Sequence, residues 1–113
     1  MKHQRVFIIH GWDGYPQEGW FPWLKRELEK HGFETHVPAM PNPDKPKIRE
    51  WVSELHNVIG EADEMTYLVG HSIGAQAVLR YISELLPDSA VGGISQLNSE
   101  RDGDSQTLAR NPN

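Results

Sequence analysis

The segment Tyr67–Ala75 constrains this chain more than any other stretch of the sequence. Its residues, Tyr-Leu-Val-Gly-His-Ser-Ile-Gly-Ala, pass from an apolar strand pattern through a serine into the start of an amphipathic helix. A serine at so sharp a strand-to-helix turn has a strained backbone, and a side chain at Gly70 or Gly74 would collide with the neighbouring strand and helix. The spacing therefore predicts a nucleophile elbow centred on Ser72.

An elbow of this kind supplies two parts of an acyl-transfer site. It lifts the hydroxyl of Ser72 clear of the sheet, and it directs the backbone N–H of Ile73, at a helix N-terminus, toward the place where an oxyanion would develop. The sequence thus predicts a serine hydrolase with Ser72 as its nucleophile.

The histidines do not follow the order that such a hydrolase needs. The usual chain order is Ser, then Asp or Glu, then His, whereas all six histidines precede Ser72: His3, His10, His31, His36, His56 and His71. Asp88, Asp102 and Asp104 follow the serine, but none stands in a recognisable context, so we assign no acidic or histidine triad member. We therefore expect activity to be impaired or absent, because losing a triad member leaves only ~10³ to 10⁴-fold acceleration over water.

Two histidines near the elbow remain candidates for a substitute base. His10 ends the first apolar segment and His71 precedes the serine, but a general base must come within ~2.6 to 3.2 Å of the serine oxygen. We expect His71 to project away from Ser72 and His10 to support the loop that follows it.

Composition bounds the remaining possibilities. At 113 residues the chain forms one domain at most, and its lack of cysteines fits a reducing, cytoplasmic location. The longest apolar run, Val6–Ile9, is too short for a membrane span or a signal-peptide core. A net charge of −5 with dispersed basic residues argues against nucleic-acid binding. No metal-ligand spacing or phosphate-binding glycine loop is present, so we expect no metal and no cofactor.

Alternating strand and helix patterns predict a parallel sheet with helices on its faces. Active residues then belong at the carboxyl ends of the strands, where Gly11, Trp12 and Ser72 lie. The expected order is a strand at 5–10, a helix at 20–32, a short strand within 33–40, a helix at 48–59, a strand at 66–69 and a helix from the elbow to Pro87.

The character of the sequence changes after Pro87. Residues 90–94 are able to start a fourth strand, but 95–113 contain no aromatic residue and few large apolar ones. Such a segment buries too little surface to offset its ordering entropy. We therefore divide the chain into a folded part, 1–94, and a divergent, flexible tail, 95–113.

Several motifs together resemble one family. They are His10-Gly11-Trp12 after the first strand, Trp20–Leu24, Met40–Pro43, Trp51 and Val91–Ile94. Over residues 5–94 the chain resembles the small α/β-hydrolases that include the YdeN-type hydrolases and the retinoblastoma-binding serine hydrolase. The resemblance implies a three-layer α/β/α fold, here with three to four parallel strands and without the family's C-terminal strands, as in a truncated or frame-shifted hydrolase.

The same resemblance implies roles for individual residues. Ser72 would be the nucleophile, the backbone N–H groups of Trp12 and Ile73 would bind the oxyanion, and His10 and Gly11 would support the oxyanion loop. The substrate would be a small carboxylic ester or related acyl compound.

A second hypothesis remains open beside the enzyme. A sheet without its remaining strands exposes unpaired backbone groups at its edge, so the chain could be a non-catalytic module that binds a partner or a second copy of itself. If the chain is an enzyme, we expect its serine to react with organophosphorus probes. If it is a non-catalytic module, we expect a dimer or larger species and no labelling of the serine.

Overall fold

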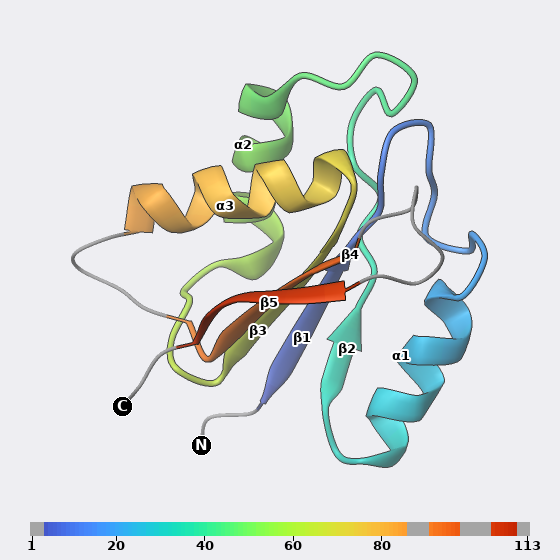
Figure 1. Ribbon diagram of the computed structural model, residues 1–113, viewed down its shortest axis with the longest axis vertical. Coiled ribbons are helices and arrows are strands. Elements are labelled where there is room, and N and C mark those ends of the chain that lie inside the picture. The colour runs from blue at the N-terminus through green and yellow to red at the C-terminus, as the bar shows by residue number, and fades with distance from the viewer. Residues whose placement is uncertain (1–3, 86–90, 98–104, 111–113) are drawn as a thin grey trace.

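In the computed structural model, which describes residues 4–85, 91–97 and 105–110, strands and helices alternate around one sheet (Figure 1). The sheet has the strand order β2-β1-β3-β4-β5. Its first four strands are parallel and the last is antiparallel. The elements are β1 (Arg5–Ile9), α1 (Phe21–Lys30), β2 (Glu34–His36), α2 (Ile48–Ile59), β3 (Thr66–His71), α3 (Ile73–Leu85), β4 (Gly93–Leu97) and β5 (Ser105–Arg110).

Strand β1 divides the core between the two faces of the sheet. Its alternate side chains point to opposite faces, so Phe7 and Ile9 join one apolar cluster and Val6 and Ile8 join the other. All four are buried because helices lie on both sides of the strand. This continuous burial explains the uninterrupted apolar run in the sequence.

The helices are distributed unequally over the two faces. Helices α2 and α3 pack against each other, and α3 also packs on β1, β3 and β4 (Figure 1). Helix α1 packs beside β2 and contributes the buried Phe21 to the smaller cluster. The larger cluster, which lies under α2 and α3, includes the fully buried Trp51, Leu55 and Tyr81.

The predicted parallel sheet and partial α/β-hydrolase-like fold are confirmed, with one strand more than predicted. Strand β5 lies within the segment 95–113, where no regular element is expected from the sequence, and it pairs antiparallel with β4 across an irregularity at Ile94 and Ser95. Backbone pairing along the edge of β4 accounts for this strand, whose sequence contains a single large apolar residue, Leu108. Strand β4 itself runs across the boundary drawn between residues 94 and 95.

Some sequence-based expectations lie outside the described residues. These are the helix end at Pro87, the acidic residues Asp88, Asp102 and Asp104, and His3. Among the helices that the structure does describe, none has the length and apolar character needed to cross a bilayer.

Candidate active site

The elbow is a single residue placed between a strand and a helix. Strand β3 ends at His71 and helix α3 begins at Ile73, so Ser72 alone makes the turn. Its backbone has φ 59°, in the left-handed region that costs about 1 to 3 kcal/mol for a residue other than glycine. The Ser72 side chain is exposed, while its carbonyl oxygen accepts the Ala75 N–H at 2.9 Å. The strained backbone of the turn therefore belongs to the exposed serine itself.

The two flanking glycines leave no room for a side chain. A Cβ on Gly70 would lie 2.5 Å from the Cα of Ala75, and one on Gly74 would lie 2.5 Å from the carbonyl oxygen of Ile9. The first contact is with α3 and the second with the end of β1. The turn is tight because strand, helix and neighbouring strand meet there backbone to backbone.

His10 supports the loop after β1 with both ring nitrogens. Its side chain is 1% exposed, its Nε2 accepts the Met40 N–H at 3.0 Å, and its Nδ1 lies 2.9 Å from the carbonyl oxygen of Gly11. Because a backbone N–H can only donate, the network assigns the proton to Nδ1, which donates to Gly11. The ring also packs edge-on against Trp51. His10 thus has no free nitrogen to offer Ser72.

The loop that follows His10 lies against the elbow. A Cβ on Gly11 would sit 3.0 Å from the His71 carbonyl oxygen and 3.1 Å from the Cβ of Ser72. This close approach places the backbone of Gly11 beside the serine. The N–H of Ile73, in the first turn of α3, has no partner within its own helix.

Hydrogen bonds join this loop to the proline-rich loop that precedes α2. The indole Nε1 of Trp12 donates to the Asp44 carbonyl oxygen at 2.9 Å, and the Asp13 N–H donates to the Pro43 carbonyl oxygen at 2.6 Å. The Trp12 side chain is nevertheless 66% exposed. Trp12 therefore forms part of the surface beside the loop that follows β1.

The sequence did not reveal Asp13 and Asn42 as part of this arrangement. Both have positive φ, 58° and 47°, and both sit at the turns of the two joined loops. The available signal was weak: Asp and Asn tolerate the left-handed region better than most residues, and each lies next to turn-forming glycine or proline.

His71 occupies a partly buried position below the serine. Its ring packs edge-on near Trp20 and Phe21, at centroid distances of 5.9 and 6.0 Å. Its Nδ1 is buried and has no hydrogen-bond partner among the described residues. Burial lowers the pKa of His71, an effect that the nearby carboxylate of Glu18 opposes. The imidazole is therefore neutral at neutral pH.

None of the described histidines hydrogen-bonds to Ser72. Three of them are engaged elsewhere: His31 with the Glu27 carbonyl oxygen, His36 with Glu34 and His56 with Glu84. Within residues 4–85, 91–97 and 105–110, no three histidine and acidic side chains gather as a metal site would require. The described residues thus bring an exposed, strained serine against the loop that follows β1, and none of the described histidines contacts its hydroxyl by a hydrogen bond.

Comparison with known proteins agrees with this fold. The family model described as Serine hydrolase matches residues 6–97. The chain therefore belongs to the serine hydrolase family. It is 38% identical over 91 residues to the protein named Putative hydrolase YdeN of Bacillus subtilis, and 37% identical over 68 residues to Serine hydrolase RBBP9 of Rattus norvegicus.

These matches cover most of this chain but only part of each relative. They span 80% of this chain and 48% of the Bacillus protein, and 56% of this chain and 34% of the rat protein. The chain thus spans less than half the length of the curated relatives it matches.

Solved structures show the same fold. The crystal structure of the ydeN gene product from B. subtilis superposes with a TM-score of 0.75 at 40% identity, covering 80% of this chain and 49% of that one. A pyrethroid hydrolase from Sphingobium faniae JZ-2 has a TM-score of 0.62 at 18% identity, with 80% and 38% covered. The second likeness concerns the fold alone.

Proposed function

We propose that Ser72 is the nucleophile of an esterase-like hydrolase acting on small acyl esters. The observation that carries the proposal is the strained, exposed serine between β3 and α3, with the Gly11 backbone packed against its Cβ. Membership in the serine hydrolase family supports the same role.

In the proposed reaction, the Ser72 oxygen forms a bond to the acyl carbon, and its proton passes to a base or to water. The N–H groups of Trp12 and Ile73 bind the resulting oxyanion. Collapse of the tetrahedral intermediate breaks the bond to the alcohol, which leaves with a proton, and water then hydrolyses the acyl-serine. His10 and Gly11 keep the oxyanion loop in place, and the exposed Trp12 ring contacts the acyl group.

The described residues supply no base, so we propose that this chain by itself reacts slowly. A serine hydroxyl is a weak nucleophile until a base takes its proton. The oxyanion groups and substrate binding would then provide most of the acceleration, ~10³ to 10⁴-fold over water. His71 is the described histidine next to the serine, but its lowered pKa makes it a poor proton acceptor.

Covalent labelling tests the proposal directly. The purified chain is incubated for a long period with a fluorophosphonate probe, and the intact mass is measured. We expect slow labelling at one site that disappears in Ser72→Ala and persists in Ser83→Ala, whose exposed serine lies near the other end of α3. Absence of labelling in a folded sample, or equal labelling of both variants, would contradict the role of Ser72.

A second candidate function is self-association through the sheet edge. Strand β5 is an outer strand of six residues that pairs with β4 on one side only. Its other backbone edge could pair with a second copy of the chain. Sedimentation velocity over a concentration series tests this candidate, which a monomer at all concentrations would rule out.

A further inference from the structure

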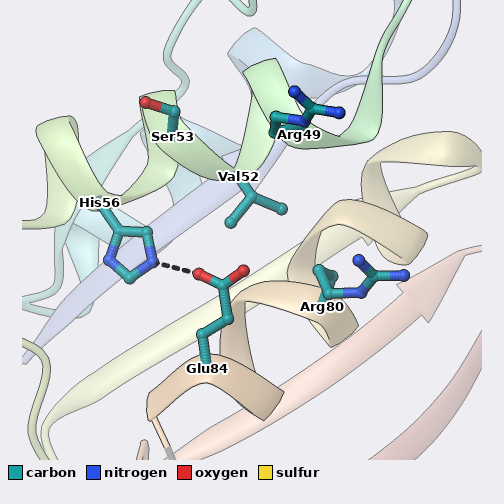
Figure 2. A pocket seen from close by; sticks show the side chains of 6 residues that line it. All are labelled: Arg49, Val52, Ser53, His56, Arg80 and Glu84. Atoms are coloured by element: carbon teal, nitrogen blue, oxygen red, sulfur yellow. Dashed lines mark hydrogen bonds and ion pairs between the residues drawn. The ribbon is translucent and has the colours of Figure 1, made fainter.

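A groove between α2 and α3 lies apart from the elbow and has its own set of polar side chains (Figure 2). It is a surface groove of about 320 Å³, and Val52 forms its apolar floor. The polar residues that line it are Arg49, Ser53, His56, Arg80 and Glu84.

The helical spacing brings these side chains to one groove. Arg49, Ser53 and His56 are separated by one turn each along α2 and therefore share a face. Arg80 and Glu84 are likewise one turn apart on α3. Figure 2 shows the two arginines toward one end of the groove and the His56–Glu84 pair toward the other. The end of the groove where the arginines lie therefore has one guanidinium group from each helix.

The two arginines have no carboxylate partner among the described residues. Arg80 and Glu84 have the spacing of an intrahelical ion pair, yet the Glu84 carboxylate contacts His56 Nε2 at 2.9 Å instead. Glu84 therefore orients His56 and leaves the Arg80 guanidinium free of it. Both arginines are exposed, and two guanidinium groups without a carboxylate partner that line one groove favour an anion as the ligand there.

We propose that this groove binds the phosphate group of a small phosphorylated molecule. Guanidinium groups from two sides can each give two N–H donors to a tetrahedral dianion, an arrangement that a planar carboxylate fills less well. The volume exceeds that of a phosphate ion and leaves room for the rest of a phosphomonoester. This site does not depend on the role proposed for Ser72.

Titration with inorganic phosphate tests the proposal, with amide NMR shifts as the readout and sodium chloride holding the ionic strength constant. We expect saturable shifts centred on α2 and α3. Arg49→Ala or Arg80→Ala should each weaken binding about tenfold, the effect of losing one hydrogen-bonded charge. The matched control is Arg26→Ala, an exposed arginine on α1, which should bind phosphate as the parent does.

Further arms separate the alternatives. Glu84→Gln removes the negative charge in the groove and should tighten phosphate binding, a gain that a misfolded variant could not show. If the groove takes a phosphomonoester, phenyl phosphate should bind more tightly than inorganic phosphate. If phenyl phosphate does not bind more tightly, the ligand is inorganic phosphate alone. The proposal would be overturned by any of three results. Acetate could bind as tightly as phosphate, Arg26→Ala could weaken phosphate binding as much as the other two arginine variants do, or sodium chloride could reproduce the shifts.

Discussion

The two faces of the sheet are packed to different degrees. On the face covered by α2 and α3, Leu68 of β3 is 1% exposed, whereas its neighbours Tyr67 and Val69 on the α1 face are only partly buried. The difference arises because two helices cover the first face and one helix, placed beside β2, covers the second. The two faces of the sheet therefore contribute unequally to the packing around the candidate site.

The position of Ser72 depends mainly on the face covered by α2 and α3. Ser72 leads into α3, and the loop of Gly11 is supported by His10, which packs against Trp51 of α2. The α1 face contributes Trp20 and Phe21 around the His71 ring. Changes on the α2 and α3 face should therefore affect both stability and reactivity, while changes on the α1 face should affect them less.

The largest contrast is expected between two tryptophans. Trp51→Ala removes a fully buried ring and its hydrogen bond to the Pro41 carbonyl oxygen, and it should lower the free energy of unfolding by about 3 to 5 kcal/mol. Trp23→Ala, on α1 and 55% exposed, should cost less than about 1 kcal/mol. Urea unfolding measures both. Equal losses would show that the two faces contribute alike.

Two glycines give the next contrast. Gly74→Ala forces a methyl group into the carbonyl oxygens of Ile9 and His10 and should cost about 1 to 3 kcal/mol or more, together with the fluorophosphonate reactivity of Ser72. Gly93→Ala is the matched control, because its Cβ would meet the Tyr67 ring at an ordinary 3.6 Å. It should be neutral or stabilising by about 0.5 kcal/mol. Tolerance of Gly74→Ala in both measurements would argue against the tight turn.

Two tyrosines test the polar groups of each face. The Tyr81 hydroxyl is buried without a hydrogen-bond partner among the described residues, and burial raises its pKa. Tyr81→Phe removes the unsatisfied group and should raise the free energy of unfolding by about 1 kcal/mol. Tyr67→Phe, which loses a long 3.5 Å contact with Gln4, should change it by less than about 0.5 kcal/mol. A loss of stability in Tyr81→Phe would reveal a partner for that hydroxyl.

The smallest expected effect is the contribution of His71, on the α1 face, to the pH dependence of the free energy of unfolding. Burial lowers the pKa of His71 below 6.5, so between the folded and unfolded pKa values the unfolded chain binds more protons. Stability from this residue is present above pH 6.5 and is lost as the pH falls toward the folded pKa. The free energy of unfolding of His71→Gln should therefore fall less between pH 7.5 and 5.5 than that of the parent chain. Parallel pH profiles would contradict the lowered pKa.

The sequence predicts those elements whose signals are local. Helix α2 has its predicted bounds, Ile48–Ile59, because an apolar stripe at helical spacing ends at Gly60, which has φ 69°. The elbow is predicted for the same reason, since the two glycines and the serine lie within five residues. In both cases the residues that determine the structure are close together in the chain.

What the sequence could not predict depends on distant backbone groups. Strand β5 has the sequence Ser-Gln-Thr-Leu-Ala-Arg, which has no clear apolar alternation, and it is ordered by pairing with β4. The hydrogen bond of His10 to Met40 and the bond of Trp12 to Asp44 involve backbone groups about thirty residues away. A backbone N–H or carbonyl group is present at nearly every residue, so its selection as a partner leaves no mark in the sequence.

The bonds between the loop after β1 and the proline-rich loop have a mechanical consequence. The indole N–H of Trp51 in α2 donates to the Pro41 carbonyl oxygen. The carbonyl oxygens of Pro43 and Asp44 accept hydrogen bonds from the Asp13 N–H and the Trp12 indole. Ser72 and Ile73 belong instead to the start of α3. A shift of α2 relative to α3 would therefore change the gap between the two N–H groups proposed to bind the oxyanion. On this proposal, the packing distance between two helices sets the width of the proposed oxyanion hole.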